Sequence, residues 1–269
     1  MTSRWTVIEG DCTKILPSLA PKSVQHMITD PPYSARVHKN ATQHARAQPL
    51  RDGNGKLSDA AISRKMELGF ESLTGAVRRA VAYEAARLAT RWSMAFSDED
   101  SMHLWRRSFE VSGLQAIRSM FWVRRGGAPQ FTGDRPAVAV EAITLAHPPG
   151  RKAWNGGGKA GLYDFPIVAN RSGHRDDRIH TTQKPLELML ALVEDFTDPD
   201  DLILDPFAGS GTTGVAALRL GRRCILIEKD PKYAALCRER LTAEEAGSTL
   251  QCARAGQEVL FKPTTKENP

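Results

Sequence analysis

The amino-acid sequence predicts an α/β fold built on a sheet of mostly parallel strands. Short apolar runs typical of buried strands alternate along the chain with longer segments in which apolar residues have helical spacing. A glycine-rich turn joins one of these strands to the helix that follows it. The length of 269 residues, with 41% hydrophobic and 25% charged residues, suits one large domain or two small ones with a sizeable core.

The first half of the chain contains predicted strands and helices on either side of a polar segment. Strands are predicted over residues 5–9 and 24–29; a turn at Gly10-Asp11 follows the first, and Asp30-Pro31-Pro32 ends the second. Residues 34–65 are rich in His, Arg, Gln, Asn and Ala, so we expect a mobile basic loop. Helices over 73–90 and 99–111 and strands over 92–96, 116–123 and 137–145 are predicted next.

The second half begins with a segment, residues 148–180, that is rich in Gly, Arg, Asn and Pro and has no predicted element. A helix over 185–196 begins at a proline, as helices commonly do. A strand over 202–204, a helix over 212–220, a strand over 224–227 and a helix over 231–241 complete the alternation.

Composition excludes several classes of protein. No window approaches 18 consecutive apolar residues, and the N-terminus lacks the apolar segment of a secretory signal, so we expect a cytoplasmic protein that crosses no membrane. The four cysteines form no C-x-x-C pair, so no structural zinc, no disulfide framework and no metal site are expected.

The formal net charge of +6 at pH 7 suggests a polyanionic partner, and its distribution is uneven. Residues 34–65 hold seven Lys or Arg against two Asp or Glu, and residues 150–184 hold seven against three. The rest of the chain is therefore mildly acidic, and two basic inserts carry the excess positive charge. Such placement favours contact with the phosphates of a nucleic acid.

The glycine-rich turn carries a G-x-G-x-x-G pattern at Gly209, Gly211 and Gly214, and Glu228 ends the next predicted strand. In dinucleotide-binding folds such a turn meets a pyrophosphate, and the acidic residue binds a ribose. Asp205 stands at the tip of the preceding strand, where an unpaired carboxylate would repel a phosphate and attract an ammonium group. The turn therefore favours S-adenosylmethionine, which has an α-amino group and no phosphate. No lysine follows Gly211, which argues against a P-loop.

The segment Asp30-Pro31-Pro32-Tyr33 follows a buried strand and is suited to hold an exocyclic amine of a nucleobase. Two prolines fix the backbone and leave the neighbouring carbonyls as acceptors. Hydrogen bonds from the amine to the Asp30 carboxylate and the Pro31 carbonyl would localise the nitrogen lone pair. The ring of Tyr33 would stack on a base taken out of the duplex.

These motifs and their order resemble the beta class of DNA amino-methyltransferases, over about residues 5–241. The catalytic Asp30-Pro31-Pro32-Tyr33 motif comes first, and the cofactor motif Asp205-Pro206-Phe207-Ala208-Gly209-Ser210-Gly211-Thr212-Thr213 comes last. Gly10-Asp11 and the segment 227–233 agree with the family, as does His180-Thr181-Thr182-Gln183-Lys184-Pro185, in which Thr181 replaces the usual proline. The resemblance implies transfer of a methyl group from S-adenosylmethionine to an amine in duplex DNA by in-line displacement.

The resemblance also implies a fold and a division of the chain. The expected fold is Rossmann-like, with a mostly parallel seven-stranded sheet that has one antiparallel strand, helices on both faces and a permuted motif order. Residues 1–33 and 66–147 would form the catalytic half, 34–65 the mobile basic loop, 148–180 the target-recognition region and 181–262 the cofactor-binding half. Family members with this order often dimerise, so a homodimer is expected.

The resemblance assigns roles to residues that match its motifs. The loop after Asp205 would hold the methionine part of the cofactor, Glu228 the ribose, and Lys184 the methionine carboxylate. The full expected cofactor set is Asp11, Cys12, Asp30, Thr182, Lys184, Asp205, Phe207, Ala208, Gly209, Ser210, Gly211, Thr212, Thr213, Glu228 and Lys229. Basic residues expected to contact DNA are Arg36, Lys39, Arg46, Arg124, Arg125, Arg151, Lys152, Arg171, Arg175 and Arg178.

Several alternatives stay open at this point. Asp at the first position of the catalytic motif resembles adenine-N6 enzymes, whereas Ser there is more typical of cytosine-N4 enzymes, so adenine is favoured over cytosine. A non-catalytic DNA-binding regulator, an RNA or protein methyltransferase and a nicotinamide-dependent oxidoreductase are rivals. The sequence identifies neither the recognition site nor whether a restriction endonuclease accompanies the enzyme.

Overall fold

A computed structural model describes residues 3–33, 72–127, 134–168 and 183–254. Its strands are β1 (Trp5–Glu9), β2 (His26–Thr29), β3 (Ser93–Ser97), β4 (Gln115–Arg125), β5 (Val140–His147), β6 (Leu162–Pro166), β7 (Leu202–Asp205) and β8 (Arg223–Glu228). Its helices are α1 (Cys12–Ile15), the 3-10 turn η1 (Leu16–Ser18), α3 (Gly75–Leu88), α4 (Met102–Val111), α5 (Leu186–Phe196), α6 (Thr212–Arg219), α7 (Pro231–Glu245) and α8 (Leu250–Arg254).

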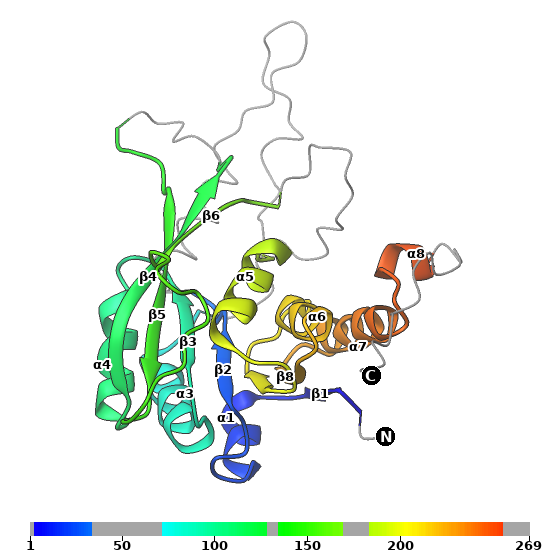
Figure 1. The fold of residues 1–269 in the computed structure, drawn as a ribbon, viewed down its shortest axis with the longest axis horizontal. Helices are drawn as coiled ribbons and strands as arrows, with labels where there is room; N and C mark the ends of the chain where they lie inside the picture. The colour runs from blue at the N-terminus through cyan, green and yellow to red at the C-terminus, as the bar shows by residue number, and fades with distance from the viewer. Residues whose placement is uncertain (1–2, 34–71, 128–133, 169–182, 255–269) are drawn as a thin grey trace, which may run out of the picture.

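All the described strands join one sheet in the order β1-β8-β7-β2-β3-β5-β4-β6 (Figure 1). Neighbouring strands run parallel except where β5 pairs with β3 and with β4, so β5 alone runs against the others within the described chain. The predicted α/β fold with one antiparallel strand is confirmed. The expected number of seven strands is wrong, because β6 pairs with β4 and adds an eighth strand at the edge.

The strand β6 lies within residues 148–180, for which the sequence predicted no regular structure. It spans five residues that pair with Phe121–Arg125, and its Tyr163 is buried and donates a hydrogen bond to Asp195 on α5 at 3.0 Å. A strand this short has too few alternating positions to stand out in a glycine-rich segment. Pairing with the long strand β4 and packing on α5 supply what the local pattern lacks.

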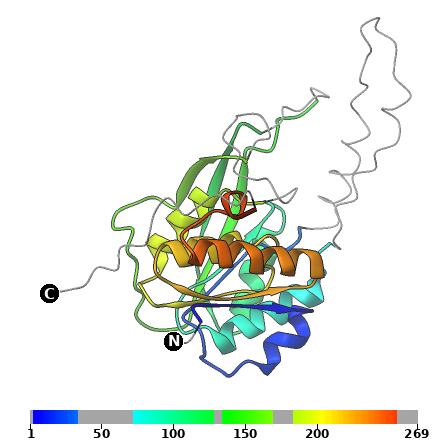
Figure 2. The same ribbon diagram turned by 90° about the vertical axis from the view of Figure 1, so that its right-hand side faces the viewer.

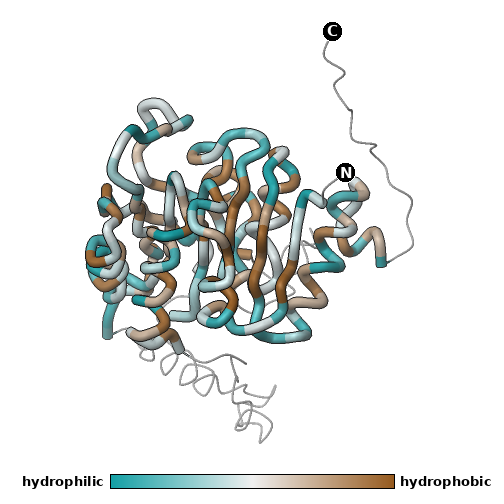
Figure 3. The backbone as a smooth tube through the Cα atoms, turned by 90° about the horizontal axis from the view of Figure 1, so that it is seen from below, coloured by the Kyte–Doolittle hydropathy of each residue, from teal (hydrophilic) through white to brown (hydrophobic). Residues whose placement is uncertain are grey.

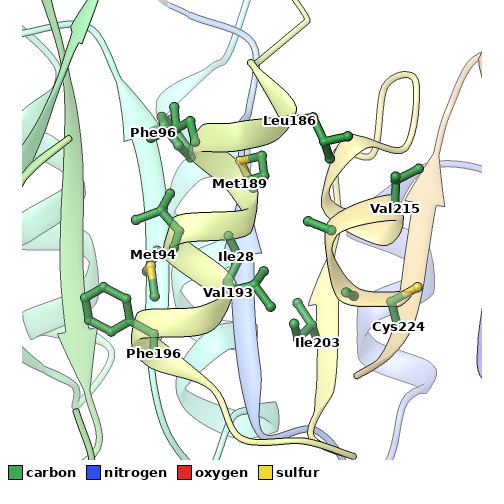
Figure 4. Close-up of a cluster of buried hydrophobic side chains, with 14 of the residues drawn as sticks. Ile28, Met94, Phe96, Leu186, Met189, Val193, Phe196, Ile203, Val215 and Cys224 are labelled. Atoms are coloured by element: carbon green, nitrogen blue, oxygen red, sulfur yellow. The ribbon is translucent and has the colours of Figure 1, made fainter. Parts of the chain in front are cut away.

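Helices cover both faces of the sheet, as Figures 1 and 2 show. Successive residues of the central strands point to opposite faces: Ile28 belongs to the buried cluster that includes residues of α5, α6 and α7, whereas Met27 belongs to the one that includes residues of α1, α3 and α4. Figure 4 shows α5 laying Met189, Val193 and Phe196 over the strands beneath it. Hydrophobic segments accordingly concentrate in the strands, and hydrophilic ones in the connections (Figure 3).

The predicted elements agree with the observed ones, whose ends differ by a few residues. Besides β6, the sequence missed the four-residue helix α1, which Asp11 caps by accepting from the Thr13 amide at 2.9 Å, and the five-residue helix α8. Such short helices carry little periodicity to detect. Within the described segments, no helix has the length and apolar character needed to cross a bilayer.

Candidate active site

The candidate site lies at one edge of the sheet, where the carboxyl ends of the parallel strands meet. Asp30 follows β2, Asp205 ends β7 and Glu228 ends β8, and β7 lies between β2 and β8. Gly10 follows β1 and donates from its amide to the Glu228 carbonyl at 2.8 Å. The two sequence motifs, separated by about 170 residues, are therefore neighbours at this edge.

Lys184 connects the catalytic motif to the start of α5. Its ammonium donates to Asp30 Oδ2 at 2.6 Å and to the Tyr33 hydroxyl at 3.1 Å, and it lies about 5 Å from the ring centres of Tyr33 and Phe96. The other oxygen of Asp30, Oδ1, is buried and has no hydrogen-bond partner among the described residues. The sequence expectation that Lys184 reaches the methionine carboxylate stays a prediction, because in this structure its ammonium is bound to Asp30.

Glu141 completes this cluster, and no sequence motif indicated it. Its carboxylate accepts a short hydrogen bond from the Tyr33 hydroxyl and forms ion pairs with Lys184 at 3.2 Å and Arg124 at 3.2 Å. Because β5 runs antiparallel, the beginning of this strand rather than its end reaches the catalytic edge, and Glu141 is its second residue. The sequence did not show which strand is reversed, so the residue could not be placed.

The ionisation of the cluster follows from burial and opposite charges. Burial raises the pKa of Asp30 more than the Lys184 ammonium lowers it, and the Glu141 carboxylate raises it further. Burial also acts on Glu141, but Lys184 and Arg124 hold the pKa of Glu141 below its usual value. Burial alone would lower the pKa of Lys184, yet the carboxylates of Asp30 and Glu141 raise it. Burial and the nearby Glu141 raise the pKa of Tyr33 well above its ordinary value.

Asp205 does not have the unpaired carboxylate that the sequence argument assumed. It is 2% exposed, and its oxygens accept hydrogen bonds from the Thr29 hydroxyl at 2.9 Å, the Phe207 amide at 3.0 Å and the Thr213 hydroxyl at 2.6 Å. Burial nevertheless raises the pKa of Asp205 to about 6. The side chain thus orders the turn from beneath, and its attraction for an ammonium group is weaker than an exposed carboxylate would exert.

Glycine is required at each of the three positions of the turn for a different physical reason. Gly209 has φ +52°, and no atom lies within 4 Å of where its Cβ would be, so the backbone faces open space. Gly211 has φ +82° and precedes α6, against Cys237. A Cβ at Gly214 would lie 2.7 Å from Leu226 and 2.9 Å from Leu241, which shows that this glycine permits close packing of helix on strand.

The acidic residues at the ends of β8 and β1 flank this turn. Glu228 accepts from the Gly209 amide at 2.8 Å and from the Asp230 amide at 2.8 Å, one bond to each oxygen. The Lys229 amide also bonds to this carboxylate, and the acceptor capacity that remains suits a ribose hydroxyl. Asp11 holds Thr13 through one oxygen, and the positive charge of Lys229 lies near enough to help lower the Asp11 pKa. Cys12 is buried beside it, and burial raises the pKa of its thiol to about 12.

The remaining expected cofactor residues surround the same turn, with one exception. Phe207 is half-buried, and Ala208, Ser210 and Thr212 are buried. The carbonyl of Ser210 accepts from Arg240 of α7 at 2.6 Å, which ties the turn to that helix. Thr182 lies outside the described residues.

The structure divides the residues expected to contact DNA. Arg124 pairs with Glu141 inside the site, and Arg125 pairs with Asp164 at 2.6 Å at the exposed end of β4, on the catalytic edge. Lys152 donates to Gln115 at 3.0 Å, and Gln115 begins β4, so Lys152 and the neighbouring exposed Arg151 lie at the opposite edge of the sheet from Asp30. The structure does not bring these last two to the catalytic motif. Arg36, Lys39, Arg46, Arg171, Arg175 and Arg178 lie outside the described residues.

Known proteins match both the sequence and the fold. Type II methyltransferase M2.DpnII of Streptococcus pneumoniae is 24% identical over 263 residues, which cover 90% of this chain and 91% of that protein. The M1.HpyAVI–SAM complex has a TM-score of 0.63 at 23% identity and covers 88% of this chain and 98% of that one. The cytosine-N4-specific PvuII DNA methyltransferase has a TM-score of 0.65 at 18% identity, with coverage of 88% and 86%.

The two structural matches support the fold, and the family assignment rests on a family model. That model, N6_N4_Mtase, is described as DNA methylase and matches residues 24–239. The matched range contains the catalytic motif, Lys184, Glu141, the glycine turn and Glu228. The chain therefore belongs to the N6/N4 family of DNA methylases.

Proposed function

We propose that this DNA methylase transfers a methyl group from S-adenosylmethionine to the exocyclic N6 of adenine in duplex DNA, after the base has been flipped out of the helix. One observation carries the proposal. The Asp30 carboxylate, whose side chain is 25% exposed, has one oxygen bound by Lys184, and its other oxygen is buried without a partner among the described residues, at the edge that holds the glycine turn. A buried acceptor in this state calls for a donor such as an amine.

The residues of the turn fit the proposed cofactor. Open space faces the backbone at Gly209, and the Glu228 carboxylate keeps acceptor capacity beyond its bonds to backbone amides. M1.HpyAVI, a structural neighbour, was solved as a SAM complex. When bound, S-adenosylmethionine supplies a methyl group on a sulfonium sulfur, which is a good leaving group.

The chain's own residues then position and polarise the acceptor. Asp30 Oδ1 and the Pro31 carbonyl accept hydrogen bonds from the two N–H groups of the amine, which draws the nitrogen lone pair out of conjugation with the ring. The Tyr33 ring provides a stacking surface for the flipped base. Holding two reactants in line can lower a barrier by ~7–11 kcal/mol. The amine proton becomes acidic only once the nitrogen is cationic, and the raised pKa of Asp30 then favours its uptake.

We propose adenine rather than cytosine because the Asp30-Pro31-Pro32-Tyr33 motif begins with Asp, which resembles adenine-N6 enzymes, whereas Ser is more typical of cytosine-N4 enzymes. A cytosine-N4 activity is the second candidate, because both amines need the same acceptors and a cytosine-N4-specific methyltransferase shares the fold.

Competing acceptors test this proposal. Purified protein is incubated with cofactor that carries a tritiated methyl group and with duplex DNA, RNA and protein together, and labelled DNA is then digested to nucleosides. We expect label in DNA, in N6-methyladenine. Label in N4-methylcytosine would replace adenine by cytosine, and label only in RNA or protein would refute DNA as the substrate.

A further inference from the structure

The cluster around Lys184 contains one charged residue for which the proposed chemistry has given no task. Glu141 is 6% exposed and lies outside the catalytic and cofactor motifs. A buried carboxylate has a high desolvation cost and persists where its partners satisfy it. Its partners here are Tyr33, Lys184 and Arg124. Lys184 binds Asp30, the proposed acceptor of the amine, and Tyr33 forms the proposed stacking surface.

We propose that Glu141 is the positioning residue of the active site, which fixes the Tyr33 ring and holds Lys184 so that Asp30 keeps one oxygen free for the target amine. This inference rests on the proposed function. Lys184 stands between two carboxylates, 2.6 Å from Asp30 Oδ2 and 3.2 Å from Glu141 Oε2. Because Glu141 also attracts the Lys184 ammonium, the ion pair between Lys184 and Asp30 is weaker than it would be with Asp30 alone.

Charge balance supports this role. Asp30 and Glu141 supply two negative charges, and Lys184 and Arg124 supply two positive ones within the same cluster. With Glu141 neutral, Lys184 would have Asp30 as its single anionic partner in the cluster. The carboxylate would then bind the ammonium more tightly and compete less well for the amine. Tyr33 would also lose the charge-assisted acceptor that orients its ring.

The charged groups facing Asp30 predict the sign of a pH effect. The charged ones are Lys184 next to the start of α5, Glu141 on β5 and Asp205 on β7, and the neutral hydroxyl of Tyr33 faces Asp30 as well. Removing the Glu141 charge deletes a group that raises the pKa of Asp30 and strengthens the pairing with Lys184, which lowers it. Both changes act in the same direction. The acid limb of the pH–rate profile should therefore move to lower pH in Glu141→Gln.

Glu141→Gln and Glu84→Gln form the matched pair of variants. Glu84 on α3 is 7% exposed and is also paired with an arginine, Arg87, but it lies at the opposite edge of the sheet. We expect Glu141→Gln to reduce kcat by about tenfold or more, because small misplacements of reacting groups are costly. The KM for cofactor should stay unchanged. Glu84→Gln should keep both kcat and the acid limb of wild type.

Two further measurements separate positioning from a merely structural role. In a double-mutant cycle, Tyr33→Phe and Glu141→Gln should combine to less than the product of their separate effects on kcat. Glu141→Asp keeps the charge but withdraws it by one methylene, so kcat should fall while the acid limb stays near that of wild type. A reduced kcat with an unmoved acid limb in Glu141→Gln, or multiplicative effects in the cycle, would overturn the inference.

A measurement that does not depend on methylation tests the role of Glu141 separately from the proposed function. The Asp30 carboxyl carbon is followed by ¹³C NMR against pH in ligand-free protein, with its signal assigned from Asp30→Asn. We expect a lower pKa for Asp30 in Glu141→Gln than in wild type; an equal or higher one would refute the inference. Wild-type protein that methylates no DNA would refute the proposed function alone.

Discussion

The two oxygens of Asp30 differ: Lys184 donates to Oδ2, whereas Oδ1 has no partner among the described residues. Asp30→Ala removes the acceptor for the amine, so methylation should be abolished. Lys184 keeps Glu141 as a counter-ion at 3.2 Å, so the fold and most of the cofactor affinity should be retained. Methyl transfer to DNA, circular dichroism and cofactor titration measure the three quantities. Wild-type turnover in this variant would exclude Asp30 from the reaction.

Tyr33 combines a ring and a hydroxyl, and two substitutions separate them. Tyr33→Phe keeps the stacking surface but loses the hydrogen bond to Glu141, whereas Tyr33→Ala loses both. We expect a moderate fall in kcat for the first and a larger one for the second, since base–aromatic stacking contributes about 1–3 kcal/mol. Single-turnover rates on duplex DNA would compare them. Equal losses would argue against stacking.

Asp205 should make the stability of the protein depend on pH. Its pKa is raised from 3.8 to about 6 in the folded state, so the folded protein binds the proton more tightly than the unfolded chain does. The free energy of unfolding contributed by this group therefore falls as pH rises from about 4 to about 6. Relative to wild type, Asp205→Asn should gain roughly 3 kcal/mol over that interval.

Urea unfolding at a series of pH values measures this difference for Asp205→Asn. A difference in unfolding free energy that stays constant between pH 4 and pH 7 would show that burial does not govern the ionisation of Asp205. The motif placed Asp205 at the end of its strand correctly, but the hydroxyls of Thr29 and Thr213 that satisfy it come from other elements.

The glycine turn and the helix after it give a prediction about two substitutions. Gly209→Ala meets no atom within 4 Å and has a left-handed backbone cost of about 1–2 kcal/mol, but its methyl group would project into the space proposed for the cofactor. Gly214→Val would be forced against Leu226 and Leu241, with an overpacking cost of about 1–3 kcal/mol.

Thermal unfolding and cofactor titration should therefore separate the two variants. Gly209→Ala should lose at least as much cofactor affinity as stability, and Gly214→Val should lose mainly stability. Unchanged cofactor affinity in folded Gly209→Ala would place the ligand elsewhere.

The strands explain why part of the site could be predicted and part could not. Asp30, Asp205 and Glu228 stand where parallel strands end, and a strand's end can be read from local sequence. Glu141 stands at the start of β5, and its place depends on the direction of that strand, which is fixed by pairing with β3 and β4 rather than by local pattern. The strand β6 was missed for the same reason, because its pairing partner defines it.

The distribution of charge over the protein gives a prediction about DNA binding. Arg151 and Lys152 lie at the edge opposite Asp30, so the double variant Arg151→Gln/Lys152→Gln should leave the salt dependence of DNA binding nearly unchanged. The triple variant Arg36→Gln/Lys39→Gln/Arg46→Gln, in the basic segment that follows the catalytic motif, should flatten it. The slope of log K against log salt falls by roughly 0.9 for each phosphate that the protein no longer neutralises.

Equilibrium binding to duplex DNA between low and high salt measures both slopes, and cofactor titration serves as the control, since neither variant should alter it. A slope flattened by the double variant and not by the triple variant would reverse the assignment of the DNA-binding edge. The sequence located two basic inserts, but it could not show that the second one begins on the far side of the sheet.

Methylation of chromosomal DNA is the most direct test of the proposed adenine methylation. A host that lacks the corresponding modification receives either the wild-type gene or the Asp30→Ala gene, and its DNA is read by long-read sequencing that detects modified bases. We predict N6-methyladenine at one recurring sequence with the wild-type gene and at none with the variant. Stably expressed wild-type protein that leaves chromosomal DNA unmodified would refute the proposed activity, and equal modification with both genes would exclude Asp30 from it.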